Sequence, residues 1–148
     1  MGGIRVSTVI DRDPAEVWET VGHIDRHVDW MLDAESITFT SSTRSGPGTT
    51  FDCATKVGPF RLVDKMEITE WEQAAVMGVR HAGVVTGSGR FTLEPLDQDR
   101  TRFTWVETLR FPWWMGGPVG GVVGGQVMKL VWRRNLANLK REVESTSS

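Results

Sequence analysis

Hydrophobic and polar positions alternate along most of the chain, and this period-two pattern predicts β-strands. The pattern covers residues 4–10, 35–42, 48–57, 60–71, 75–82, 85–95 and 100–111. Short connections such as "SGPG", "VGP" and "LDQD" separate the later segments. Strands joined by short connections pair with their sequence neighbours in opposite directions, so we expect an antiparallel meander.

The period changes after the first strand. Asp13 is suited to cap a helix, and Pro14 fits the first helical position. An apolar patch follows within "AEVWETV", which predicts a short helix. Residues 23–32 predict a second short helix or turn.

A long helix is expected near the end of the chain, over residues 118–144. Its core-facing stripe at 100° per residue consists of Gly121, Gly125, Met128, Trp132, Leu136, Leu139 and Val143. Each glycine inside a helix costs about 1 kcal/mol relative to alanine. A stripe that begins with glycines and ends with bulky residues therefore predicts room between the start of the helix and the sheet.

These elements predict an α+β fold in which a curved, seven-stranded antiparallel sheet grips the C-terminal helix. The sheet needs one face covered, and the helix offers one apolar stripe. Two short helices follow the first strand. The length of 148 residues suits a single domain over residues 1–144, with a disordered tail at 145–148.

Composition and charge narrow the possible partners. The formal net charge is −2 and basic residues form no stripe, so nucleic acid is not an expected partner. Cys53, the single cysteine, cannot form an internal disulfide, and no signal-peptide pattern begins the chain, so a cytoplasmic location is expected. Lys129 and Arg133 leave the apolar run before them shorter than the ~20 residues that span a bilayer. Peripheral membrane contact stays open.

Glu107 is the first candidate for chemistry. Period-two counting places it on the same strand face as Phe103, Trp105 and Leu109. A carboxylate in apolar surroundings suits a general acid or base. The alternatives are a buried ion pair, or a residue that turns outward near a bulge.

Asp64 and His81 raise the same question on other strands. Asp64 shares a face with Met66, and an inward carboxylate would make a cavity polar or would pair with a basic group. Arg80 and His81 are adjacent, so only one of them can point inward. Met77 and Val79 lie on the same face as His81 by period-two counting and favour His81 as the inward residue. A histidine on an apolar face is more often structural than catalytic, so both roles stay open.

The spacing of His23 and His27, with Asp25 and Asp29 between and beside them, resembles that of metal ligands on a helix. A third well-placed ligand is missing, so we expect a solvated polar helix face, no metal and no cofactor. The adjacent Trp113 and Trp114, before the last helix, could form a lid, insert at a membrane surface or plug the open end of the sheet.

The order and spacing of several segments resemble a known family. These segments are "DRDPAEVWETVGHIDRHVDW", "GPGTTF", "MEITEW", "GSGRFTLEPLDQDRTRFTWVETLRF" and "NLANLKREVE". Together they resemble the START/Bet v 1-like (SRPBCC) superfamily, in particular its polyketide cyclase/dehydrase and lipid-transport branch. The resemblance implies a helix-grip fold with a cavity between the sheet and the terminal helix, without fixing an activity.

We therefore expect a protein that binds a hydrophobic or amphipathic small molecule, such as a lipid, an isoprenoid or a polyketide-like compound. The expected ligand-cavity residues are Phe51, Asp64, Met66, His81, Phe91, Trp105, Glu107, Phe111, Trp113, Gly121, Gly125, Met128 and Trp132.

Two alternatives remain, and either a monomer or a homodimer is compatible with the sequence. One is a cyclase/dehydratase-like enzyme without a metal, in which Glu107 removes a proton beside a carbonyl. The other is a dimerisation or membrane-surface module that uses a second apolar stripe on the last helix. That stripe consists of Val119, Val123, Val127 and Leu130.

Overall fold

The computed structural model describes residues 3–57, 60–110 and 117–145, and the side-chain surroundings of these residues except 57, 60 and 117–125. The elements in chain order are β1 (Ile4–Ile10), α1 (Pro14–Val21), the 3₁₀-helix η1 (Ile24–Asp29), β2 (Ala34–Phe39), β3 (Thr50–Val57), β4 (Phe60–Glu72), β5 (Val76–Ala82), β6 (Thr86–Leu96), β7 (Arg100–Arg110) and α2 (Gly117–Ser145).

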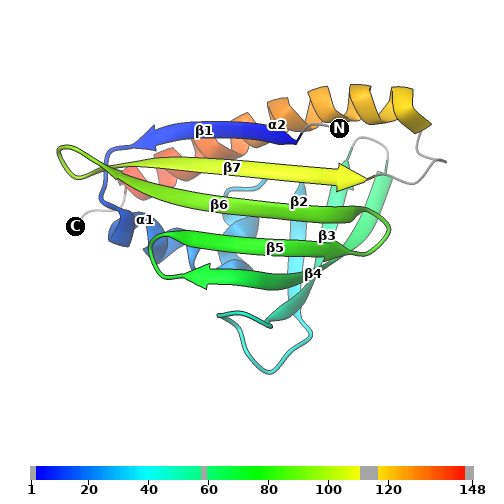
Figure 1. Ribbon diagram of the computed structural model, residues 1–148, viewed down its shortest axis with the longest axis horizontal. Coiled ribbons are helices and arrows are strands. Elements are labelled where there is room, and N and C mark those ends of the chain that lie inside the picture. The colour runs from blue at the N-terminus through cyan, green and yellow to red at the C-terminus, as the bar shows by residue number, and fades with distance from the viewer. Residues whose placement is uncertain (1–2, 58–59, 111–116, 146–148) are drawn as a thin grey trace.

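All these strands form one seven-stranded antiparallel sheet in the order β1-β7-β6-β5-β4-β3-β2. Strands β2 to β7 follow one another as a meander, whereas β1 crosses to the far edge and pairs with β7 (Figure 1). This arrangement confirms the predicted helix-grip fold of the α+β class, including the short helices after the first strand.

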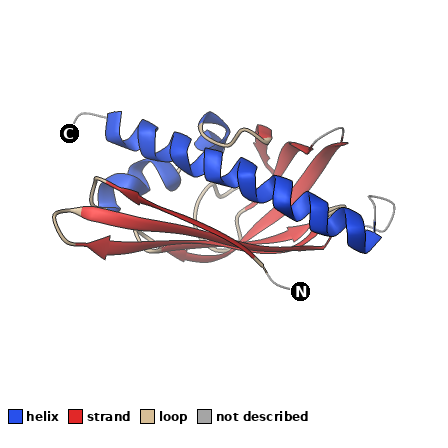
Figure 2. Cartoon of the chain, turned by 90° about the horizontal axis from the view of Figure 1, so that it is seen from above, coloured by secondary structure: helices blue, strands red, loops and turns tan. Residues whose placement is uncertain are grey.

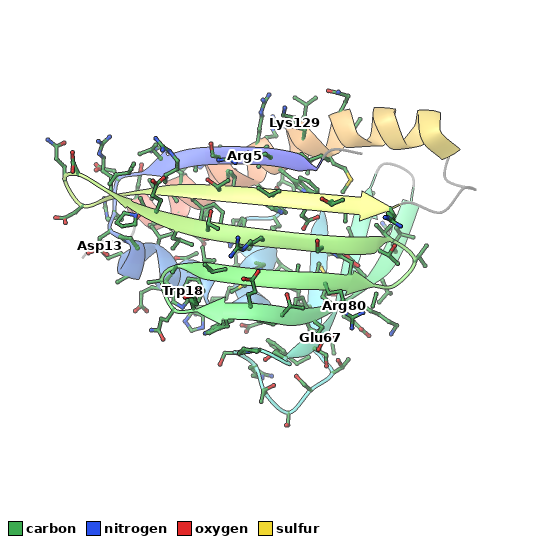
Figure 3. The ribbon with its side chains drawn as sticks, in the orientation of Figure 1. Arg5, Asp13, Trp18, Glu67, Arg80 and Lys129 are labelled. Atoms are coloured by element: carbon green, nitrogen blue, oxygen red, sulfur yellow. The ribbon has the colours of Figure 1, made fainter. Side chains whose placement is uncertain are left out.

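Local sequence explains why α1 begins where it does. Asp13 lies at the start of α1 (Figure 3). Its carboxylate accepts a hydrogen bond of 2.9 Å from the backbone N–H of Glu16, and Pro14 opens the helix. Val17, Trp18 and Val21 are buried from the same helix. The cap and the apolar face together fix α1 against the end of the sheet.

Helix α2 lies across the concave face of the curved sheet (Figure 2). The described part of its predicted core stripe is buried and consists of Met128, Trp132, Leu136, Leu139 and Val143. Trp132 stacks on Trp105 of β7, with ring centroids 4.8 Å apart and an interplanar angle of 24°. The helix and the sheet therefore share one aromatic core.

Several element boundaries differ from the sequence-based expectation by one to three residues. Strand β2 ends at Phe39 rather than at residue 42, because the hydroxyl oxygen of Ser41 accepts a hydrogen bond of 3.0 Å from the backbone N–H of Thr50. This side-chain bond replaces a ladder bond. Helix α2 includes Ser145, which was expected in the tail.

Within the described part of the chain, no helix combines the length and the apolar character needed to cross a membrane. Although α2 is 29 residues long, its charged side chains divide the apolar stretches.

Candidate functional site

A cavity of about 90 Å³ lies between the inner face of the sheet and α2. It is bordered by nine of the residues expected from the sequence, namely Phe51, Asp64, Met66, His81, Phe91, Trp105, Glu107, Met128 and Trp132. Phe111 and Trp113 lie outside the described residues. The backbones of Gly121 and Gly125 belong to α2, but their surroundings are not described, so the room predicted beside them stays a prediction.

The wall of the cavity is mainly apolar and is rich in methionine. Met31, Met66, Met77 and Met128 come from four different segments of the chain and all border it. Methionine side chains are unbranched and polarizable, and they adopt several shapes at low cost. A wall of this kind is suited to ligands of more than one shape.

A cluster of three polar side chains interrupts this apolar wall. His81 of β5 lies between two carboxylates: its Nδ1 is 2.9 Å from Asp64 Oδ2 of β4, and its Nε2 is 3.3 Å from Glu107 Oε1 of β7. All three side chains are largely buried. We call Asp64, His81 and Glu107 the polar cluster.

The strand between β5 and β7 makes the contact of His81 with Glu107 possible. In the register of the sheet, Gly87 of β6 lies opposite His81, and Gly89 of β6 lies opposite Glu107. Since neither glycine has a side chain, the imidazole and the carboxylate can meet over the intervening strand. The "GSG" segment carries no side chain that could indicate this role from the sequence, apart from Ser88.

The carboxylates determine the charge of His81. Burial acts to lower its pKa, but the hydrogen bonds to Asp64 and Glu107 and the negative charges of both outweigh burial and raise the pKa to about 10. His81 is therefore an imidazolium at neutral pH. With both carboxylates ionised, the polar cluster has a net charge of −1.

The structure also shows which of two neighbouring residues points inward. His81 is 4 % exposed. Arg80 projects to the opposite face, where its guanidinium lies 2.6 Å from the carboxylate of Glu67 (Figure 3). The carboxylate of Asp64 thus pairs with a basic group, one of the two possibilities that the sequence left open.

His27 corrects one expectation, because the predicted solvated helix face is wrong for this residue. Its side chain is buried, and its Nε2 lies 2.7 Å from the carbonyl oxygen of Val21. The segment forms a 3₁₀-helix, whose period of three residues aligns Ile24, His27 and Trp30 on the buried face. Burial lowers the pKa of His27 to about 4.

The two histidines, His23 and His27, lie in different surroundings. His23 is exposed and does not share the environment of His27. Across residues 3–57, 60–110 and 117–145, no group of three or more His, Cys, Asp or Glu side chains is arranged to hold a metal ion.

Sequence reasoning missed Cys53, which borders the cavity, and Asn135, which bonds to the cavity residue Asp33. Cys53 borders the cavity, and burial raises the pKa of its thiol to about 11, so the thiol is not ionised at neutral pH. Asn135 is 0 % exposed; it accepts a hydrogen bond from the Leu32 backbone N–H (2.8 Å) and donates one to Asp33 Oδ1 (2.9 Å). These bonds hold the segment before β2 against α2.

A second hollow of about 120 Å³ lies beside that segment. It shares Asp33, Met128 and Trp132 with the cavity and has Leu32 and Val127 on its border. Because three residues border both spaces, the second hollow adjoins the cavity from the side of α2. We call it the outer hollow.

The second apolar stripe of α2 is described only in its later half. Val127 is 45 % exposed and Leu130 is 64 % exposed, whereas the surroundings of Val119 and Val123 are not described. Exposure of apolar side chains is what a contact surface needs. A dimer or membrane contact through this stripe stays a prediction.

Solved structures share the fold. The chain is similar to TTHA0849 from Thermus thermophilus (TM-score 0.84, 17% identity, covering 99% of each chain). It is also similar to a START superfamily protein from Mycobacterium smegmatis (TM-score 0.82, 10% identity, covering 99% of this chain and 100% of the other). A third is the Zhui aromatase/cyclase from Streptomyces sp. R1128 (TM-score 0.71, 17% identity, covering 96% and 93%).

No curated protein sequence matches the chain significantly. The family model described as "Polyketide cyclase / dehydrase and lipid transport" matches residues 1–144. This match covers nearly the whole chain and agrees with the helix-grip architecture. The chain therefore belongs to the polyketide cyclase/dehydrase and lipid-transport family.

Proposed function

We propose that the protein binds a hydrophobic or amphipathic small molecule in the cavity between the sheet and α2. The observation that carries this proposal is the composition of the wall, which is mainly apolar and contains the buried polar cluster. Apolar walls with a few fixed polar groups are typical of small-molecule sites, since the walls supply affinity and the polar groups fix orientation. Lipids, isoprenoids and polyketide-like compounds have this chemistry.

The cavity is smaller than the pockets that bind drug-sized ligands. About 90 Å³ is below the roughly 300–1,000 Å³ of pockets for drug-sized ligands. A larger ligand must therefore displace side chains, and the four methionines of the wall are the residues best able to move. Binding is expected to reorder these methionines while the strands stay in place.

The first test is native mass spectrometry of protein purified from its own host. A co-purified apolar compound would support the proposal and identify the ligand. The second test is titration with a small apolar probe such as naphthalene, followed through Trp105 and Trp132, whose indole rings border the cavity. Saturable quenching of tryptophan fluorescence is expected.

The decisive test is a variant in which a larger side chain fills the cavity. Val79 borders the cavity, so Val79→Phe adds a ring to the wall and should weaken naphthalene binding by at least about tenfold. Val84→Phe is the matched control, because Val84 is 48 % exposed. If the folded Val79→Phe protein binds the probe as tightly as the Val84→Phe protein, the ligand does not enter this cavity.

A second candidate function is catalysis of proton transfer at a carbon beside a carbonyl. The contact between Glu107 and His81 at the cavity wall favours it. Glu107 would take the proton and become neutral, which would free the Nε2–H of His81 to donate to the enolate oxygen. The total charge of site and substrate would stay constant, because the negative charge would move from Glu107 to the enolate.

The enzymatic candidate has its own test. A ketone such as 2-tetralone exchanges its α-protons for deuterium, and proton NMR follows the rate. The protein should accelerate exchange, and Glu107→Gln should abolish the acceleration while naphthalene still binds. Acceleration that survives in Glu107→Gln would remove Glu107 from this role; binding without any acceleration would favour a carrier.

A further inference from the structure

Two polar atoms of the cavity residues are buried without a hydrogen-bond partner in the described part of the chain. One is Asp64 Oδ1, whereas the other oxygen of the same carboxylate pairs with His81. The second is Nε1 of Trp105, a residue that is 3 % exposed. A buried polar atom without a partner is unfavourable, because it has lost its hydrogen bonds to water. Both Asp64 and Trp105 border the cavity, so a ligand that enters it and shifts these side chains can restore such bonds.

The charges around the cavity are unbalanced toward the negative. Asp33, Asp64 and Glu107 all border it. His81 is the buried cation of the described wall, and both of its ring nitrogens already face carboxylates. It therefore has no N–H left to donate to an anionic ligand.

The other basic residues near the cavity do not change this balance. Arg90 also borders it, but its guanidinium is about half exposed and lies 3.1 Å from the Glu70 carboxylate. Lys56 borders only the outer hollow. His27 is neutral at pH 7, because burial lowers its pKa to about 4. An anionic ligand would thus enter a buried site with surplus negative charge and with no unpaired cation among the described residues that border it.

We propose that the cavity selects neutral apolar ligands that bear a hydroxyl group and rejects carboxylates of the same size. The ligand hydroxyl donates its hydrogen bond to Asp64 Oδ1. A carbonyl or ether oxygen elsewhere in the ligand accepts from Nε1 of Trp105. This inference deepens the proposed binding function and rests on it: fatty alcohols, sterol-like alcohols and phenols fit, whereas fatty acids do not.

Three probes of similar size separate the possibilities: naphthalene, 2-naphthol and 2-naphthoate, titrated at pH 7 by isothermal calorimetry. A hydrogen bond to a charged acceptor should make 2-naphthol bind at least about tenfold more tightly than naphthalene. The carboxylate of 2-naphthoate should make it bind more weakly than naphthalene. Binding of 2-naphthoate as tight as that of 2-naphthol would overturn the inference.

The same experiment distinguishes the failure of this inference from the failure of the proposed function. If naphthalene and 2-naphthol bind equally well, the cavity binds ligands but Asp64 does not select them. If none of the three probes binds, both the inference and the binding function fail.

Variants assign the selectivity to a residue. Asp64→Asn removes the negative charge, so the ratio of the 2-naphthoate and 2-naphthol dissociation constants should fall by at least about tenfold. Asp52→Asn is the matched control: it makes the same charge change on β3, where the Asp52 carboxylate pairs with Lys65 at 3.6 Å on the outer face. If the ratio of dissociation constants changed equally in both variants, the selectivity would come from the net charge of the protein at long range. That result would overturn the role of Asp64.

A second variant keeps the inference testable if Asp64→Asn does not fold. Trp105→Phe keeps a ring in the core but removes the indole N–H. This variant should weaken the binding of 2-acetylnaphthalene, which has a carbonyl acceptor, several-fold more than it weakens the binding of naphthalene. If the two probes lost the same factor in affinity, the indole N–H would contact no ligand acceptor.

Discussion

The side chain of Glu107 lies across Gly89, its partner on the neighbouring strand. A Cβ atom at Gly89 would lie 2.6 Å from Glu107 Oε1 and 2.7 Å from Glu107 Cγ, closer than real Cβ contacts. The glycine therefore provides the space through which the carboxylate reaches His81. A residue with no side chain thus determines the position of a charged group.

The first prediction follows from this contact. In Gly89→Ala, the methyl group should displace the Glu107 carboxylate from His81. Having lost one of its two carboxylate partners, His81 should show a pKa lower by at least about one unit. Titration of the His81 ring protons by NMR measures the change.

A matched glycine serves as the control for that variant. A Cβ at Gly78 would lie 2.9 Å from Glu70 Oε1, which belongs to the carboxylate that pairs with Arg90 on the outer face. Gly78→Ala should disturb this surface pair and leave the titration of His81 unchanged. A native His81 titration in folded Gly89→Ala would show that the carboxylate tolerates the methyl group.

The second prediction concerns the dependence of stability on pH. The pKa of His81 is raised to about 10, so its contribution to the free energy of unfolding is complete below the unfolded pKa of about 6.5. It is lost as pH rises through 10, by an amount on the order of 5 kcal/mol. His27 acts in the opposite range: its pKa is lowered to about 4, so its contribution is present above pH 6.5 and is lost as pH falls toward 4.

Stability is thus expected to be greatest near pH 6.5, and urea unfolding at a series of pH values measures it. His81→Gln should flatten the alkaline side of the profile, whereas His27→Gln should flatten the acid side. The informative quantity is the slope of the free energy of unfolding against pH, because either substitution also changes the stability by a constant amount at every pH. An alkaline slope unchanged in His81→Gln would mean that His81 is not an imidazolium in the folded protein.

The third prediction tests Asn135. Asn135→Ala leaves the Leu32 N–H and the Asp33 carboxylate without their bonds to α2, which should lower the free energy of unfolding by about 2–4 kcal/mol. Hydrogen exchange of the Leu32 amide should also become faster. Asn138→Ala is the comparison, because Asn138 is only partly buried and its bond to the Trp30 carbonyl oxygen is longer, at 3.4 Å. An equal decrease in the free energy of unfolding in the two variants would show that the hydrogen bonds of Asn135 contribute no more than the bond of Asn138.

The fourth prediction uses two adjacent residues of α2. Met128 is 6 % exposed and Val127 is 45 % exposed. Met128→Ala should cost about 2–4 kcal/mol of unfolding free energy and enlarge the cavity, whereas Val127→Ala should cost less than about 1 kcal/mol. Chemical denaturation measures both. A larger loss from Val127→Ala would mean that the exposed stripe is covered in solution, for instance by a second copy of the chain.

Sequence periodicity predicted orientation well where strands are regular. Strand β7 pairs with β6 without a register shift, so counting by two places Glu107 on the face of Trp105, as the structure shows. In η1 the assumption of a solvated helix face failed. There the three-residue period of a 3₁₀-helix buries His27, and a test of that period against the sequence would have found Ile24, His27 and Trp30 together.

The contact of His81 with both carboxylates could not be predicted in the same way. It depends on the registers of β4 against β5, of β5 against β6 and of β6 against β7, and the turns that join these strands set the registers. Each strand alone shows which face a residue occupies. Only the assembled sheet shows which residues on that face meet.

The pairing of β1 with β7 has a consequence for how the protein folds. Ile4 lies opposite Glu107, so the first strand stays without its sheet partner until almost the whole sheet has been synthesised. Closing so long a loop is entropically costly, and proteins rich in such distant pairings fold slowly. The edge of the sheet nearest Glu107 is therefore expected to be completed late in folding, and truncation before β7 leaves a chain that cannot close its cavity.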